Sequence, residues 1–435
     1  MNNLFDKKYT QHNDIQMNTL RQAKSIINAI NPEKNTNFNV AIDLIERLKY
    51  LCKINPLITE MKPLLARGFA NFILYFDSEN INDAIPFLTQ LEILHNDNLE
   101  SEDICIEFSH GIVNMISITR CSQVMISIRW LSYLQLLQKK CSSNQEIKDL
   151  YAQALYKLTI ICGEKEYVFA QQFLNTLIVF QSQYNEDRNI VVLLSKSVVN
   201  MIAYSETNEI IKRLDYIAKL KELHRDYFYI DIMPVLLAQG YSNLIINLKF
   251  QNFDNAQSKL SELERLTVDC SDFEEVKLEY IKGLGGFLYT FSKRLKSQTL
   301  ANYIEKFTRL TVEFLNKLEI LSITIMVLER ILTEKEQIAL LPKYLLSILV
   351  IHFNNKNCDD GYKCLKKMNY LYSRNTENEE LALATILSNS VAFKALILTN
   401  NFQLAQEAFS QIELIAGVYI NHKEILTVFI DTKLN

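Results

Sequence analysis

Glycine and proline are scarce in this sequence, with nine glycines and six prolines in 435 residues. Folds that depend on many tight turns, such as β-sandwiches and doubly wound α/β domains, use both residues far more often. Long helices, in contrast, need little of either, because both residues disfavour a helix interior. The scarcity therefore disfavours all-β and α/β architectures and favours an all-helical chain.

The chain also lacks an excess of charge of either sign. Its 46 basic and 50 acidic residues give a formal net charge of -4 and a pI near 6.0. Domains that bind nucleic acids are usually strongly basic, so we expect no direct nucleic-acid partner. No apolar run approaches the roughly 20 residues that span a bilayer, and the N-terminal MNNLFDKKYTQHNDIQ has no signal-peptide hydrophobic segment. We expect a cytoplasmic protein without a membrane span.

Motifs that carry catalysis or bind metals are missing as well. The eight cysteines include no CxxC pair, and the six histidines form no HxxxH or HExxH motif. A phosphate-binding GxxxxGK[ST] loop and a GxSxG nucleophile turn are also absent. His110 could face a groove, but a core or surface role is favoured for it. The sequence therefore predicts no catalytic residue, no metal site and no cofactor, and hence a protein that is not an enzyme.

An internal repeat of 43 residues runs through the first two thirds of the chain. One column of this repeat contains only leucine: Leu48, Leu91, Leu134, Leu177, Leu220 and Leu263. A second column, seven residues earlier, is mostly alanine: Ala41, Ala84, Ser127, Ala170, Arg213 and Ala256. Together with further apolar columns, these spacings place the residues on one face of a helix, the second helix of each repeat.

The first helix of each repeat carries a column of small residues followed by a column of amides. The small residues are Ser25, Gly68, Gly111, Ala154, Ser197, Gly240 and Gly283. Three residues further on stand Asn28, Asn71, Asn114, Lys157, Asn200, Asn243 and finally Gly286. A small residue lets a neighbouring helix approach closely, which is the role that we predict for the first column. The second column is the candidate binding site.

The register divides the chain into four segments. We expect an N-terminal extension over 1–17, a regular array of six helix pairs and the start of a seventh over 18–290, an irregular helical segment over 291–340, and further helix pairs with a capping helix over 341–435. The regular register ends at GLGG, and three glycines so close together weaken a helix. Gly283, Gly285 and Gly286 are therefore predicted to form a kink or hinge.

The start of each second helix carries a family resemblance. The segments FDNA, FNVA, INDA, YVFA and FQLA resemble the second helix of a tetratricopeptide repeat, and LIINLKFQNFDNAQSKL is the best single match. The resemblance covers roughly residues 18–290 and 340–417. The usual repeat of that family has about 34 residues, whereas HEAT and armadillo repeats have about 40–47 and form the alternative. The resemblance implies an all-α, right-handed superhelical α-solenoid of antiparallel helix pairs.

The same resemblance implies two functions. The first is a scaffold or adaptor that holds a protein or peptide in the concave groove, where the amide column would bind the ligand backbone and Lys157 a carboxylate. The second is a regulatory sensor, since tetratricopeptide arrays with long repeats are similar to the peptide-sensing domains of bacterial quorum-sensing regulators. A sensor of this kind would lack the DNA-binding domain of those regulators. The amide column has a structural alternative, in which each amide bridges neighbouring helices. The oligomeric state stays open.

Overall fold

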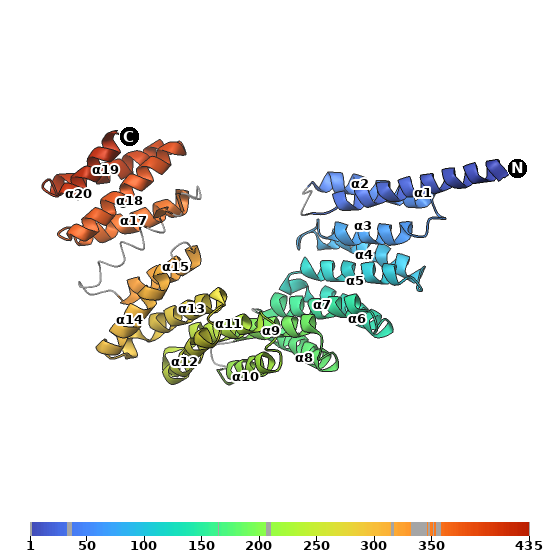
Figure 1. The fold of residues 1–435 in the computed structure, drawn as a ribbon, viewed down its shortest axis with the longest axis horizontal. Helices are drawn as coiled ribbons and strands as arrows, with labels where there is room; N and C mark the ends of the chain where they lie inside the picture. Colours follow the sequence, from blue (N-terminus) through green and yellow to red (C-terminus); the bar gives the residue numbers. More distant parts are fainter. Residues whose placement is uncertain are drawn as a thin grey trace. The chain divides into compact units, whose positions relative to one another are not determined.

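The computed structural model describes residues 2–32, 37–163, 165–205, 210–314, 317–331, 346, 349–350, 352–353 and 358–434, and the side chains of this part from residue 16 onward except at a few helical positions. All regular structure in these ranges is helical, and no strand occurs among them. Successive helices pack in antiparallel pairs, so the predicted all-α solenoid is confirmed (Figure 1). The chain divides into two compact units, Met1–Leu237 and Ala238–Asn435.

The first unit contains five helix pairs and the start of α11. Its helices are α1 (Asn2–Ala29), α2 (Phe38–Ile54), α3 (Met61–Ile73), α4 (Ile81–Asn96), α5 (Glu102–Ser117), α6 (Val124–Lys140), α7 (Gln145–Gly163), α8 (Tyr167–Gln183), α9 (Arg188–Tyr204) and α10 (Ile210–Asp226). In the structure, α1 is one helix that covers most of the expected extension over 1–17 and the first helix of the first repeat.

The second unit contains the remaining described helices. They are most of α11 (Met233–Ile246), α12 (Phe253–Asp269), α13 (Glu274–Phe291), α14 (Ser297–Val312), α15 (Leu318–Ile331), α17 (Cys358–Arg374), α18 (Glu379–Leu398), α19 (Phe402–Val418) and α20 (Lys423–Leu434). The segment expected to be irregular, 291–340, contains α14 and α15, and its last residues lie outside the described part. The division between the units falls within α11 and not at the end of the 43-residue register.

The two columns of the second helices form the core of the repeats. All six leucines of the leucine column are fully buried, as are five of the six residues of the alanine column. The sixth, Arg213, is 1% exposed and donates a hydrogen bond to the carbonyl oxygen of Ser205. Polar caps begin several helices: the side chain of Asn37 accepts from Asn39 N and Val40 N. Sequence periodicity therefore identified the buried face of these helices correctly.

The small-residue column packs against the leucine column. A Cβ atom built on Gly68 would lie 2.6 Å from Leu48 Cδ2, one on Gly111 would lie 2.5 Å from Leu91 Cδ1, and one on Gly283 would lie 2.9 Å from Leu263 Cδ2. In each case the leucine stands twenty residues earlier, on the second helix of the preceding pair. The prediction that small residues allow close helix approach is confirmed at these three positions.

The glycines of GLGG do not break their helix. α13 runs without interruption from Glu274 to Phe291, and all three glycines are buried. A Cβ on Gly285 would lie 2.6 Å from Ile323 Cγ2, and one on Gly286 would lie 2.6 Å from Ile246 Cγ1 and 3.2 Å from Ile246 Cα. The amide column ends in glycine at 286 because the backbone of α11 lies too close for a side chain. These glycines therefore allow close packing of α13 on its neighbours, and the kink or hinge expected at Gly283, Gly285 and Gly286 stays a prediction.

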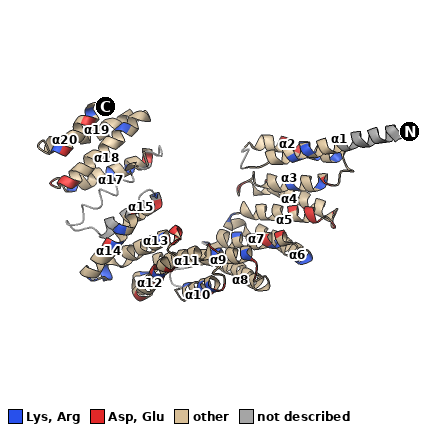
Figure 2. Cartoon of the chain, in the orientation of Figure 1, with Lys and Arg blue, Asp and Glu red and all other residues tan. Residues whose placement is uncertain are grey.

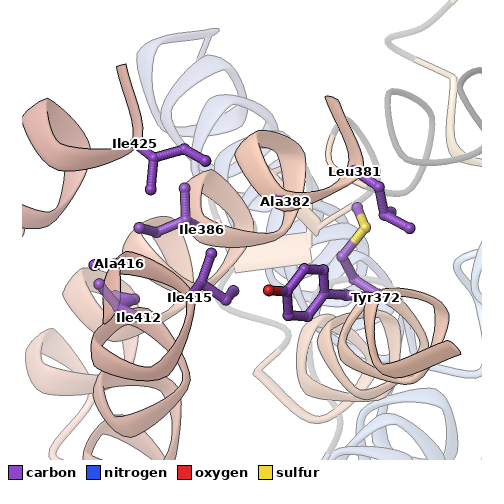
Figure 3. Packing of buried hydrophobic residues seen from close by; sticks show 9 residues of the cluster. Tyr372, Leu381, Ala382, Ile386, Ile412, Ile415, Ala416 and Ile425 are labelled. Carbon is purple, nitrogen blue, oxygen red and sulfur yellow. The ribbon is translucent and has the colours of Figure 1, made fainter. Parts of the chain in front are cut away.

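The helices α17 to α20 share a core in the second unit. Tyr372 of α17, Ile386 of α18, Ile415 of α19 and Ile425 of α20 meet in it (Figure 3). Among the described residues, α18 is the one helix long and apolar enough to cross a membrane by length and composition. Its apolar side chains pack on α17, α19 and α20, and helices in the core of a protein are often as long and as apolar as this one.

Candidate ligand-binding face on the first helices of the pairs

The amide column lies on the first helices of successive pairs, which we call the A helices. Asn28 is exposed on α1, whereas Asn71 on α3, Asn114 on α5, Lys157 on α7 and Asn200 on α9 are partly buried. Consecutive A helices pack directly against one another, so these side chains form a row across the first unit. Asn243 on α11 is also partly buried and belongs to the second unit. The order of the row follows the order of the repeats.

One rung of this row has a structural role. Asn114 Nδ2 donates a hydrogen bond of 2.9 Å to the carbonyl oxygen of Ala70, on the neighbouring A helix. This amide bridges α5 and α3, as the structural alternative proposed. Within the described part of the chain, the side chains of Asn71, Lys157 and Asn200 make no such bond. In this row, Asn114 therefore has a structural role. The polar side-chain atoms of Asn71, Lys157 and Asn200 have no protein partner within the described part of the chain.

A cleft of about 360 Å³ opens along α3, α5 and the start of α7. It contains Asn71 from the amide column. Its lining residues are Pro63, Leu64, Arg67, Asn71, Asp103, Ile106, Glu107, His110 and Glu146. Figure 2 shows that charges of both signs are spread along the helices of the first unit, and this cleft collects five charged or titratable side chains in one place.

Contacts between polar side chains inside the cleft connect three consecutive A helices. Arg67 Nε of α3 lies 3.9 Å from Glu107 Oε1 of α5. His110 Nε2, one turn along α5, lies 2.9 Å from Glu146 Oε1 of α7. Outside the cleft, a similar contact joins the next two A helices, where Asn189 Nδ2 of α9 donates to Asp149 Oδ2 of α7 at 3.0 Å. The contacts with Glu107 and Glu146 hold Arg67 and His110 at the cleft surface, where a ligand would compete for them.

Burial raises the pKa of the Glu107 carboxyl above its ordinary value. The nearby charges of His110 and Arg67 oppose this shift, while Glu146 and Asp103 add to it. Burial likewise lowers the pKa of the Lys157 ammonium, and no charged group contributes to that shift. Each of these groups would bind an opposite charge more strongly than an exposed one would, because little water screens it.

Glu107→Gln is expected to raise the melting temperature at pH 7 and to leave it unchanged at pH 4. An acid whose folded-state pKa is raised costs stability above its unfolded pKa of 4.5, and the cost grows until the pH has passed the folded value. The weak pair with the exposed Arg67 side chain offsets little of this effect. Thermal unfolding of both proteins between pH 4 and pH 8 checks the prediction. A variant that is less stable than the wild type at pH 7 would contradict it.

Sequence reasoning missed most of the cleft residues. The column four residues before the amides contains Lys24, Arg67, His110, Gln153, Lys196, Gln239 and Lys282. This spacing places each of them one turn before its counterpart in the amide column and on the same face, which was a usable signal. The column mixes cations with amides, so no single residue type marked it. His110, for which a core or surface role was favoured, lines the cleft.

Comparisons with known proteins assign the chain to no family. No family model matches the chain, and no curated protein matches it either. Among solved structures, the chain is similar to one from a study of a conserved phosphorylation switch that controls the interaction between cadherin and β-catenin. The identity is 13% and the TM-score 0.39, over 94% of this chain and 90% of that chain. Within the described residues, no group of three His, Cys, Asp or Glu side chains could hold a metal ion.

Proposed function

We propose that the chain is a non-enzymatic scaffold or adaptor of tetratricopeptide-like type, which binds a protein or peptide along the A helices of its first unit. The observation that carries the proposal is the row Asn71, Lys157 and Asn200, whose partly buried polar groups have no partner among the described residues. A cytoplasmic location belongs to this proposal. Such a row can bind the backbone of an extended chain, because a carboxamide both donates and accepts hydrogen bonds.

The dimensions of the row fit an extended peptide. Directly packed helices lie about 8–10 Å apart, and an extended chain rises about 3.3 Å per residue. Each A helix would therefore meet about every third residue of the ligand. The three steps from Asn71 on α3 to Asn200 on α9 correspond to about nine ligand residues. Lys157, between them, would favour a ligand with a carboxylate at that point.

A selection from a library of random twelve-residue peptides tests the proposal. We expect the full chain to enrich peptides of extended character that carry an acidic residue near the middle. Hydrogen exchange of the complex should then show protection in α3, α5, α7 and α9. Failure to enrich any peptide above an empty support would argue against a peptide-binding face.

A regulatory sensor is the second candidate, and it is distinguished by a change of shape. Solution scattering of the chain with and without a selected peptide separates the two functions. A scaffold should keep its radius of gyration, whereas a sensor should contract when the ligand binds. The hinge predicted at Gly283, Gly285 and Gly286 belongs to the sensor alone, because a scaffold needs no movement there.

A further inference from the structure

Two cysteines of the first unit lie in contact. Cys105 Sγ, in the first part of α5, is 3.7 Å from Cys141 Sγ, which caps the C-terminal end of α6. The two residues are 36 positions apart, and their contact joins the N-terminal part of α5 to the C-terminal end of α6, the other helix of the same pair. Both thiols are free. A disulfide bond needs the sulfur atoms at about 2.0 Å, so the two side chains must rotate and move closer for the bond to form.

The surrounding contacts already hold the two segments together. Asn144 Nδ2, in the linker after Cys141, donates a hydrogen bond of 2.6 Å to Glu102 Oε1 at the start of α5. Lys140 Nζ donates to the carbonyl oxygen of Leu99 at 3.3 Å. Each bond connects the segment around Cys141 with the segment around Cys105. A covalent bridge between the sulfurs would therefore fix an arrangement that already exists.

The two thiols differ in access to solvent. Cys141 is partly exposed, whereas the side chain of Cys105 is 2% exposed. An external reagent would therefore meet Cys141 first, and Cys105 would react only from within the fold. We propose that Cys105 and Cys141 form a thiol modification site, at which a small-molecule disulfide such as glutathione disulfide converts the pair into an intramolecular disulfide.

The reaction balances in two exchange steps. The Cys141 thiol loses its proton, and its sulfur attacks one sulfur of glutathione disulfide, breaking that S–S bond and releasing one glutathione, which takes up the proton. The Cys105 thiol then loses its proton and attacks Cys141 Sγ, breaking the mixed disulfide and releasing the second glutathione. Two protein thiols are oxidised, and one glutathione disulfide is reduced to two glutathiones. Burial, the largest cause, raises the pKa of the Cys105 thiol above its ordinary value, so Cys105 resolves the mixed disulfide more slowly than an exposed thiol in the same place would.

The repeat supplies a matched control in Cys270. It caps the end of α12 as Cys141 caps α6, three repeats later in the same column, and it is also partly exposed. The position that corresponds to Cys105 carries Pro234 in that repeat. Cys270 therefore has the same location at a helix end without a partner thiol in that column. It reports what an exposed thiol of this kind does alone.

Peptide mapping by mass spectrometry tests the proposal on the full chain. The protein is incubated with glutathione disulfide in excess over glutathione, alkylated and digested without reduction. We expect a linked peptide that contains Cys105 and Cys141, and a glutathione adduct on Cys270. In Cys105→Ser the adduct should accumulate on Cys141, since no thiol resolves it. In Cys141→Ser, Cys105 should stay unmodified until the protein is denatured, when alkylation recovers it in full.

Three results would overturn the proposal. The first is a Cys141 adduct that persists in the wild type as it does in Cys105→Ser. The second is a wild-type Cys141 that stays fully alkylatable while Cys270 carries glutathione. The third is a bridge from either residue to another cysteine in place of the linked pair. Circular dichroism of both serine variants, which differ from cysteine by one atom, confirms that the comparison is made on folded proteins. No ligand is required, so the outcome is independent of the proposed peptide-binding face.

Discussion

Gly111→Leu is expected to lower the free energy of unfolding by about 3 kcal/mol or more, through overpacking of the contact between α5 and α4. A Cβ at this position would already lie 2.5 Å from Leu91 Cδ1 and 3.2 Å from Leu88 Cδ1. Leucine adds three further carbon atoms to a site whose neighbours are fully buried. Chemical denaturation of wild type and variant measures the loss.

Alanine at the same position should cost much less. The nearest atoms are the ends of leucine side chains, which can shift more cheaply than backbone atoms, and the same column holds Ala154, Ser25 and Ser197 in other repeats. A Leu91→Ala change in the Gly111→Leu background should recover part of the lost stability. The coupling between the two substitutions then measures the contact itself.

Gly417 is the matched control for this prediction. It is also a helical glycine, in α19, but no atom lies within 4 Å of a Cβ built on it. Gly417→Leu should therefore stabilise the protein by up to about 1 kcal/mol, because leucine has a higher helix propensity than glycine. Equal losses at Gly111 and Gly417 would show that backbone conformation, and not close packing, accounts for the small column.

Asn71→Ala, Lys157→Ala and Asn200→Ala together are expected to weaken binding of a selected peptide about 100-fold or more. A neutral hydrogen bond contributes about 0.5–1.5 kcal/mol and one to a charged group about 1.5–3 kcal/mol, and about 2.7 kcal/mol corresponds to a factor of 100. Stability should change little, because these side chains have no protein partner among the described residues. Fluorescence titration with the labelled peptide gives the affinity.

A control variant separates this effect from a general loss of polar surface. Gln172→Ala, Asn175→Ala and Lys139→Ala remove two amides and one ammonium from exposed positions on the second helices α8 and α6. The control should bind the peptide as the wild type does. Asn114→Ala should lower stability by about 1 kcal/mol, since it removes the bond to Ala70. Undiminished binding by the triple variant would refute the proposed role of the row.

Much of the fold could be predicted because one periodicity runs through most of the chain. Leu48, Leu134 and Leu263 recur at a fixed spacing on one helical face, and burial of that face is nearly independent of distant contacts. The packing role of Gly68, Gly111 and Gly283 followed from the same columns. Helix propensity alone marks the three glycines of GLGG as a weak point, whereas in the structure α13 runs through them and packs closely on its neighbours.

The residues and contacts of the candidate site could be predicted from the sequence only in part, because they depend on tertiary structure. Sequence placed Asn71 and Asn114 in equivalent positions, yet Asn114 bonds to Ala70 and Asn71 lines a cleft. The pairing of His110 with Glu146 and the contact of Cys105 with Cys141 each join residues 36 positions apart.

The sequence by itself determined which residues share a helix face, because that depends on the spacing along one helix. Tertiary structure alone decided which side chains of neighbouring helices meet. The rise and rotation from one repeat to the next set the distances between those side chains, and the columns of the 43-residue repeat carry no information on them.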